Sequence, residues 1–148
     1  MAEETGGTGL GDRSVAMERL SKGVYEVTNV RGGTIRIGGG ESDDFTPVEL
    51  LLTAIAGCTA VDVDYITSKR AEPVSYTVTA SGEKLKDEHG NHMGELQVRF
   101  SVVFPEGEAG DRAREMLPKA IQMSEDRLCT VSRTVALGTP IDSRVAEG

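Results

Sequence analysis

The first third of the chain alternates between hydrophobic and polar residues with the two-residue period of a β-strand. This alternation covers residues 24–30, which are rich in β-forming side chains, and it returns over residues 34–37 after a glycine turn. A mixed run over residues 14–20 precedes them, separated by a turn at residues 21–23. We therefore predict a meander of about three strands, followed by a flexible acidic loop over residues 38–44.

The pattern changes over residues 45–70, which are apolar nearly all round for three helical turns. Thr46 can cap such a helix, Pro47 suits its first position, and Glu49 completes a capping box. A helix without a polar face is typical of a buried element, so we expect it to lie in the core. Polar residues interrupt the apolar run before it reaches the ~18 residues of a membrane span, and Pro73 ends the helix.

Two further alternating segments, residues 74–85 and 94–104, have matching periods. They predict a long antiparallel hairpin around a polar turn at residues 86–92. The apolar residues of the next segment, residues 111–128, fall on one side of a helix. Pro118 lies inside this predicted helix and indicates a kink or a restart there.

The last part of the chain has weaker signals. Thr130 or Ser132 is placed to cap a short helix that Gly138 closes, and residues 139–145 are expected to form a last edge strand. The order is then strands, helix, hairpin, helices and strand, without the alternation that builds a parallel sheet. This order indicates an α+β fold.

Composition narrows the functional classes. The 148 residues carry a net charge of −8, whereas a protein that binds nucleic acid needs a basic face. Residues 1–13 lack the basic start and apolar run of a signal peptide, so we expect a cytoplasmic protein in a reducing compartment. We predict that these residues are a disordered tail and that residues 14–148 form a single domain.

The two cysteines are the most reactive groups of the sequence. Cys58 lies within the apolar helix, where a thiol is inert unless another part of the fold supplies a basic group. Cys129 lies at the junction of two helical segments, where a helix N-terminus favours the thiolate. Both positions are also compatible with a buried core thiol. If the two sulfurs meet, a disulfide in a reducing compartment is expected to cycle rather than to persist.

Other motifs indicate less. His89 and His92 have a spacing seen in metal sites, but a solvated turn explains them, since no cysteine is close in the sequence. The glycines at residues 38–40 are not followed by the lysine of a phosphate-binding loop. We therefore expect neither a metal nor an organic cofactor.

Two segments together resemble the OsmC/Ohr family of peroxide-handling proteins. They are residues 47–63, which include Cys58, and the run Cys129-Thr130-Val131-Ser132. The resemblance extends over residues 15–145. It implies an OsmC-like fold, in which antiparallel sheets wrap around two central helices in an intertwined homodimer with active sites at the subunit interface. It also implies that Cys58 is the peroxidatic thiol and Cys129 the resolving thiol.

Active members of that family pair the reactive thiol with an arginine of the strand layer and a glutamate just after the helix-starting proline. Arg19 resembles the arginine position of the Ohr branch and Arg36 that of the OsmC branch, so either could activate the thiol. Here Val48 follows Pro47, and the acid comes one place later as Glu49. One residue is about 100° of helix rotation, so Glu49 is either catalytic or only a helix cap.

The resemblance thus implies a thiol-dependent peroxidase that reduces organic hydroperoxides through a sulfenate and disulfide cycle of Cys58 and Cys129. A dithiol electron donor would reset the pair, and a lipoylated protein is the donor that the Ohr branch suggests. The expected partners are a second copy of the chain, this donor and the hydroperoxide, with no nucleic acid and no membrane. The alternatives are a non-catalytic member that binds a small apolar ligand or senses redox state, and a structural protein with two core cysteines.

Overall fold

The computed structural model of the protein describes residues 9–146, and their contacts divide the chain into two compact units. The first unit ends at Leu51 and the second begins at Leu52. The prediction of one domain over residues 14–148 stays a prediction. Most of the predicted disordered tail, residues 1–8, lies outside the described residues.

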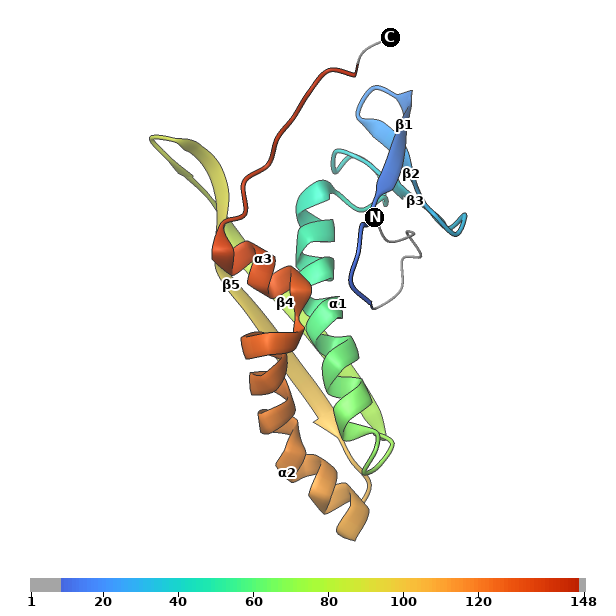
Figure 1. Ribbon diagram of the computed structural model, residues 1–148, viewed down its shortest axis with the longest axis vertical. Helices are drawn as coiled ribbons and strands as arrows, with labels where there is room; N and C mark the ends of the chain where they lie inside the picture. The colour runs from blue at the N-terminus through green and yellow to red at the C-terminus, as the bar shows by residue number, and fades with distance from the viewer. Residues whose placement is uncertain (1–8, 147–148) are drawn as a thin grey trace. The chain divides into compact units, whose positions relative to one another are not determined.

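The first unit is built on a three-stranded antiparallel sheet in the order β1-β2-β3, labelled in Figure 1. The strands are β1 (Val15–Ser21), β2 (Val24–Asn29) and β3 (Thr34–Ile37), which confirms the predicted meander. Between β1 and β2, Gly23 has a φ of 75°, a conformation that favours glycine. All residues of β1 are exposed in the single chain, so β1 buries little apolar surface there.

Helix α1 (Pro47–Thr67) begins with the predicted capping box. The backbone N–H of Thr46 donates to Glu49 Oε1 at 2.9 Å, and the N–H of Glu49 donates to Thr46 Oγ1 at 3.3 Å. The helix ends three residues before the predicted end. Arg70 lies just beyond it and donates from Nη1 to the carbonyl of Ile66 at 2.9 Å, so a basic side chain satisfies a carbonyl of the last turn.

The prediction that α1 is buried on all sides is wrong for the single chain. Its buried residues recur every fourth position and form one line, Ile55, Thr59, Val63 and Thr67. By contrast, the side chains of Val61 and Tyr65 are exposed, at 49% and 65%. One apolar face of α1 is therefore uncovered.

The expectation that no segment could span a membrane also needs correction. Among the described residues, α1 is long and apolar enough to cross a membrane by length and composition. The core helix of a soluble protein meets the same criterion, and a polar contact ties the part of α1 that lies in the second unit to that unit. Tyr76 Oη donates to the carbonyl of Ala60 at 2.8 Å, which joins α1 to the following strand.

The second unit contains the hairpin of β4 (Ser75–Asp87) and β5 (Gly90–Val103). The strands pair antiparallel down to Asp87 and Gly90, so the predicted seven-residue turn is too long. Asp87 Oδ1 closes the tight turn by accepting from the backbone N–H groups of His89 and Gly90 at 2.8 and 3.1 Å. As a result, His92 lies in β5.

Helix α2 (Glu108–Met123) begins three residues before the predicted start and continues through Pro118. The irregularity comes later, as one π-helical turn over Ser124–Leu128, and α3 (Thr130–Leu137) follows. Gly138 ends α3 in the left-handed conformation with φ 62°, as predicted.

The predicted last strand over residues 139–145 is wrong, because these residues have no regular secondary structure and are exposed. Pro140 explains part of this, since it has no N–H to donate to a strand ladder. Taken together, the antiparallel sheets and helices confirm the α+β class. Two central helices inside a homodimer stay a prediction.

Candidate active site

Cys129 lies between the π-turn and α3, where it is fully buried. Its backbone N–H donates to the carbonyl of Ser124 at 2.8 Å. Its Sγ accepts from the backbone N–H of Ser132 at 3.3 Å and lies 3.1 Å from Ser132 Oγ. Cys129 is therefore the N-cap of α3. The prediction of Thr130 or Ser132 as the cap is wrong, because the helix already begins at Thr130 and the capping side chain belongs to the residue before it.

Cys58 lies in the middle of α1 and is partly exposed, and both cysteines are free. The two thiols are close enough for each to shift the pKa of the other: Cys129 raises the pKa of Cys58, and Cys58 lowers the pKa of Cys129. The backbone N–H of Val131, in the first turn of α3, lowers the pKa of Cys58. The N-terminus of α3 therefore serves both sulfurs, through Val131 for Cys58 and through Ser132 for Cys129.

The pKa of the Cys58 thiol is raised above its ordinary value. Burial is the largest cause. The N–H of Val131 opposes it, but the hydrogen bond to Cys129 and the negative charges of Cys129 and Asp62 raise this pKa further. No basic side chain is among the strongest influences on the pKa of Cys58.

The pKa of the Cys129 thiol is lowered. Burial is again the largest single effect and raises it, but four hydrogen bonds together outweigh burial. They come from the Ser132 hydroxyl, the Thr59 side chain, the Ser132 N–H and the Cys58 thiol. These two directions favour the thiolate at Cys129 over the thiolate at Cys58.

The structure thus brings the two predicted cysteines together. The other three predicted site residues, Arg19, Arg36 and Glu49, belong to the first unit and stay predictions as activators of the thiol. Arg36 Nε lies 3.7 Å from Asp44 Oδ2, and Glu49 forms the capping box of α1.

Sequence reasoning missed a buried polar link beside the cysteines. Ser124 is fully buried and donates from Oγ to Asp62 Oδ2 at 2.8 Å. Asp62 lies one helical turn after Cys58 on α1, and Ser124 begins the π-turn that leads to Cys129. The signal in the sequence was an acid, Asp62, within an apolar helical run, since a carboxylate that is partly removed from water gains from a hydrogen-bond partner.

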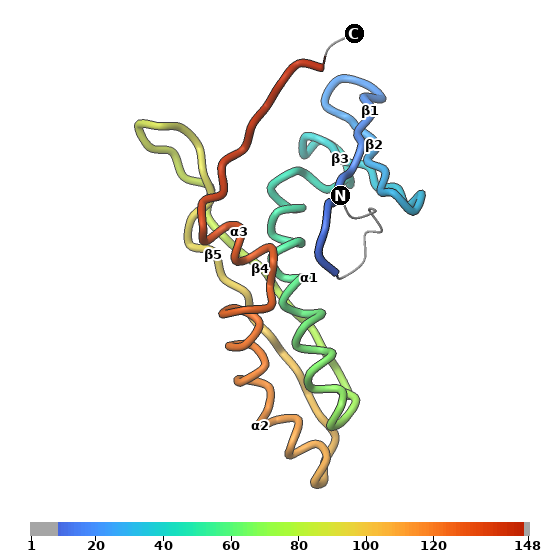
Figure 2. The backbone as a smooth tube through the Cα atoms, viewed as in Figure 1, coloured from blue at the N-terminus to red at the C-terminus, as the bar shows by residue number. Residues whose placement is uncertain are grey.

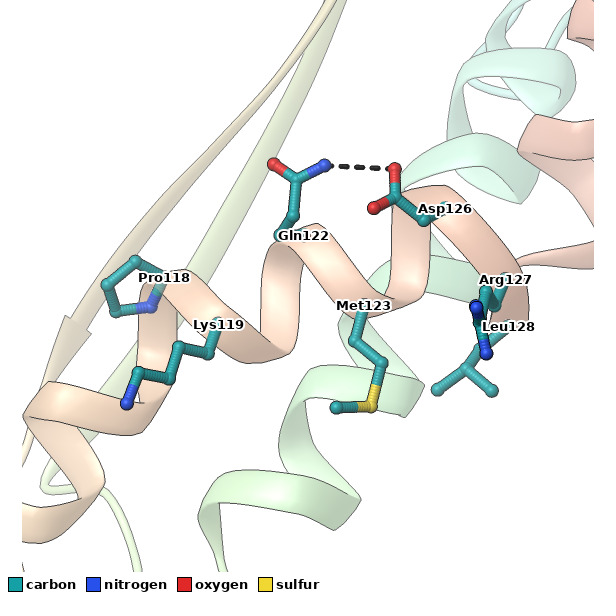
Figure 3. A pocket seen from close by; sticks show the side chains of 7 residues that line it. All are labelled: Pro118, Lys119, Gln122, Met123, Asp126, Arg127 and Leu128. Carbon is teal, nitrogen blue, oxygen red and sulfur yellow. Dashed lines mark hydrogen bonds between the residues drawn. The ribbon is translucent and has the colours of Figure 1, made fainter.

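A pocket of about 310 Å³ opens beside Ser132, whose hydroxyl lies against Cys129. Its lining is mostly apolar and comes from α1, β5, the π-turn and α3: Ile55, Leu96, Val98, Glu125, Ser132, Val135 and Ala136. A second, shallower groove follows α2 and the π-turn, where Gln122 and Asp126 are hydrogen-bonded (Figure 3). The first pocket therefore offers apolar surface close to the thiols.

The two histidines of the hairpin lie beside acids. His92 Nδ1 is 3.7 Å from Asp87 Oδ2, and His89 Nε2 is 3.5 Å from Glu88 Oε1. Within residues 9–146, no group of three or more histidine, cysteine, aspartate or glutamate residues is placed to hold a metal ion.

The fold and the site define a small α+β protein with two neighbouring free thiols. Comparison with known families shows to which family the protein belongs. The model of the OsmC-like protein family matches residues 39–144, well over half of the chain, and the chain belongs to this family.

Relatives and solved structures agree with this assignment. An uncharacterised protein of Mycobacterium tuberculosis is 25% identical over 133 residues, which cover 88% of this chain and 94% of that protein. The structure of an OsmC-like protein of unknown function from Vibrio cholerae is similar with a TM-score of 0.70 and 16% identity, covering 84% of this chain and 94% of the other. The organic hydroperoxide resistance protein OhrB of Bacillus subtilis has a TM-score of 0.53 and 14% identity, covering 85% and 92%. These structural similarities concern the fold.

Proposed function

We propose that this protein is a thiol-dependent peroxidase that reduces organic hydroperoxides through a cycle of Cys58 and Cys129. The observation that carries the proposal is the proximity of two free thiols, Cys58 on α1 and Cys129 at the start of α3, each of which shifts the pKa of the other. A hydroperoxide resistance protein with a similar fold supports the same class of reaction.

Exposure and charge divide the roles of the two sulfurs. Cys58 is partly exposed and can meet a hydroperoxide, whereas Cys129 is fully buried. The attacking group must be a thiolate. In our proposal, Cys58 passes its proton to the neighbouring Cys129 thiolate as it attacks.

The first chemical step breaks the O–O bond. The Cys58 sulfur bonds to the distal oxygen of the hydroperoxide, giving a sulfenic acid, and the alkoxide leaves. The alkoxide takes the proton that Cys129 received and becomes the alcohol. Cys129 is then a thiolate again.

The second step forms the disulfide. The Cys129 thiolate attacks the sulfur of the Cys58 sulfenic acid, and hydroxide leaves and is protonated to water. A dithiol donor reduces the disulfide by exchange and is itself oxidised. Over the cycle, one hydroperoxide becomes one alcohol and one water, and the donor loses two electrons.

Further elements of the proposal follow from the family. A lipoylated protein would be the donor, the working form would be a cytoplasmic homodimer, and Arg19 or Arg36 would supply positive charge for the thiolate. The uncovered apolar face of α1 supports a second copy of the chain, because Val61 and Tyr65 are exposed in the single chain. The apolar pocket beside Ser132 suits the organic group of the substrate.

The test is consumption of cumene hydroperoxide with dihydrolipoamide as the reductant, for the wild type and Cys58→Ser. We expect Cys58→Ser to lose essentially all activity while keeping the wild-type circular dichroism spectrum. Equal rates for the two proteins would overturn the proposal.

Thiol titration separates the enzyme from the non-catalytic alternative. After one equivalent of hydroperoxide, the enzyme loses two thiols and contains an intramolecular bond between Cys58 and Cys129. A protein that only binds an apolar ligand keeps both thiols.

A further inference from the structure

The link between Ser124 and Asp62 connects the segments that carry the two cysteines. Ser124 Oγ donates to Asp62 Oδ2 at 2.8 Å, and the Ser124 side chain is fully buried. Asp62 lies four residues after Cys58 on α1, so the two side chains share one face of the helix. Figures 1 and 2 show the segment from α2 to α3 running beside α1, in agreement with this contact.

The same serine also holds the backbone of Cys129. The Ser124 carbonyl accepts from the Cys129 N–H at 2.8 Å, across the π-turn. Ser124 thus contacts Asp62 with its side chain and Cys129 with its main chain. A hydrogen bond to a carboxylate is stronger than one between neutral groups, and this one fastens the π-turn to α1.

We propose that Ser124 and Asp62 are positioning residues that hold Cys129 against Cys58 and so set the rate at which the Cys58 sulfenic acid is resolved. This inference rests on the proposed peroxidase function. The π-turn is one residue wider than an α-helical turn, so the chain there needs a fixed point if the Cys129 sulfur is to stay within reach of Cys58. Fast resolution matters because a second hydroperoxide otherwise converts the sulfenic acid irreversibly to sulfinic acid.

The chain offers a matched control in the same turn. Gln122 Nε2 donates to Asp126 Oδ1 at 2.9 Å, on the groove side drawn in Figure 3. This bond is exposed and joins two residues of the α2 and π-turn segment, whereas the bond of Ser124 reaches α1. Gln122→Ala and Ser124→Ala therefore each remove one side-chain hydrogen bond to a carboxylate, but only Ser124→Ala breaks the link to α1.

The experiment is a single turnover with cumene hydroperoxide on the full chain. Samples are quenched at set times, the sulfenic acid is trapped with dimedone, and mass spectrometry separates dithiol, sulfenic acid, disulfide and sulfinic acid. We expect Ser124→Ala to form the sulfenic acid at the wild-type rate but the disulfide roughly tenfold more slowly, since a hydrogen bond to a charged group is worth at least that factor. Excess hydroperoxide should then give more sulfinic acid. Gln122→Ala should match the wild type, and equal disulfide rates in the two variants would overturn the inference.

Asp62→Asn separates position from charge and covers the case in which Ser124→Ala does not fold. Asparagine keeps an oxygen that can accept from Ser124 but removes the negative charge beside Cys58. We expect disulfide formation to slow clearly less than in Ser124→Ala, because the hydrogen bond is kept although its acceptor is now neutral. If Asp62→Asn forms the disulfide roughly tenfold more slowly than the wild type, the charge of Asp62 rather than the position of Cys129 controls disulfide formation, and the inference fails.

Equilibrium with glutathione tests the position of the thiols without any hydroperoxide. The equilibrium constant for forming the Cys58–Cys129 disulfide measures how well the two sulfurs are held together. We expect it to fall roughly tenfold in Ser124→Ala and to stay unchanged in Gln122→Ala. A fall in this constant, in a protein whose wild type does not consume hydroperoxide, would uphold the positioning role and reject the peroxidase; an unchanged constant would reject the positioning role.

Discussion

Cys58 and Cys129 contact each other from two contrasting local structures. Cys129 caps the N-terminus of α3, is fully buried, accepts from the Ser132 N–H and is hydrogen-bonded to the Ser132 hydroxyl. Cys58 lies in the middle of α1, is partly exposed, and has the negative charge of Asp62 nearby. The buried sulfur therefore holds the negative charge more readily, while the sulfur that holds it less readily is the one that a substrate can reach.

The contrast shows that burial alone does not decide which thiol ionises. Burial raises the pKa of both thiols and is the largest influence on each. The hydrogen-bond donors around each sulfur decide which thiol has the lower pKa. Ser132, Thr59 and Cys58 lower the pKa of Cys129 by enough to outweigh burial. The N–H of Val131 lowers the pKa of Cys58, but by less than burial and the other influences raise it.

The largest effect is expected from Cys129→Ser. The disulfide cannot form, so this variant should consume one equivalent of hydroperoxide and stop with oxidised Cys58. The hydrogen bond and charge of Cys129 both raise the pKa of Cys58, so removing them should lower it. Thiolate absorbance as a function of pH should show a lower midpoint than Cys58 has in the wild type.

The reciprocal variant, Cys58→Ala, is the control for this sign. The Cys58 thiol lowers the pKa of Cys129 by donating to its sulfur, so the midpoint of Cys129 should move upwards. Midpoints that move in the same direction in both variants would contradict the division of charge between the two thiols.

A smaller effect is expected from Ser132→Ala. The variant removes the hydroxyl that lies 3.1 Å from Cys129 Sγ but keeps the N–H that caps the helix. The pKa of Cys129 should rise, so disulfide formation after a hydroperoxide pulse should slow several-fold at neutral pH. At alkaline pH, where Cys129 is ionised in both proteins, the rates should converge, and Ser132→Thr should behave as the wild type. A slowdown that is the same at every pH would mean that Ser132 acts on structure rather than on ionisation.

Periodicity predicted most of the elements around these thiols because it depends on local burial. The alternating segments became β2, β3 and the β4–β5 hairpin, and the apolar run became α1. The capping box of α1 was also predictable, since Thr46 and Glu49 interact within one helical turn. Such features involve residues close in sequence, which a single sequence can report.

The features missed depend on contacts that sequence spacing does not encode. Cysteine is not among the usual N-cap residues, so the role of Cys129 was assigned to its hydroxyl neighbours. The hydrogen bond of Ser124 to Asp62 joins residues far apart in the chain. The resemblance predicted a partnership of the two thiols, but their opposite pKa shifts required knowledge of which groups face each sulfur.

The smallest effect concerns the start of α1, where a structural role of Glu49 competes with a catalytic one. Thr46→Ala removes one half of the capping box and should lower the free energy of unfolding by about 1 kcal/mol. Glu49→Gln should leave the stability nearly unchanged, because the amide oxygen can accept from the Thr46 N–H as the carboxylate does. Chemical denaturation measures both effects.

Peroxide consumption by the same variants then separates the two roles of Glu49. As a helix cap, Glu49 contributes a hydrogen-bond acceptor, which glutamine also provides, so Glu49→Gln should keep the wild-type rate. As a catalytic acid it contributes charge, which glutamine lacks. A stable Glu49→Gln protein with a strongly reduced rate would therefore assign the carboxylate to the chemistry of Cys58, and a wild-type rate would leave it with the start of the helix alone.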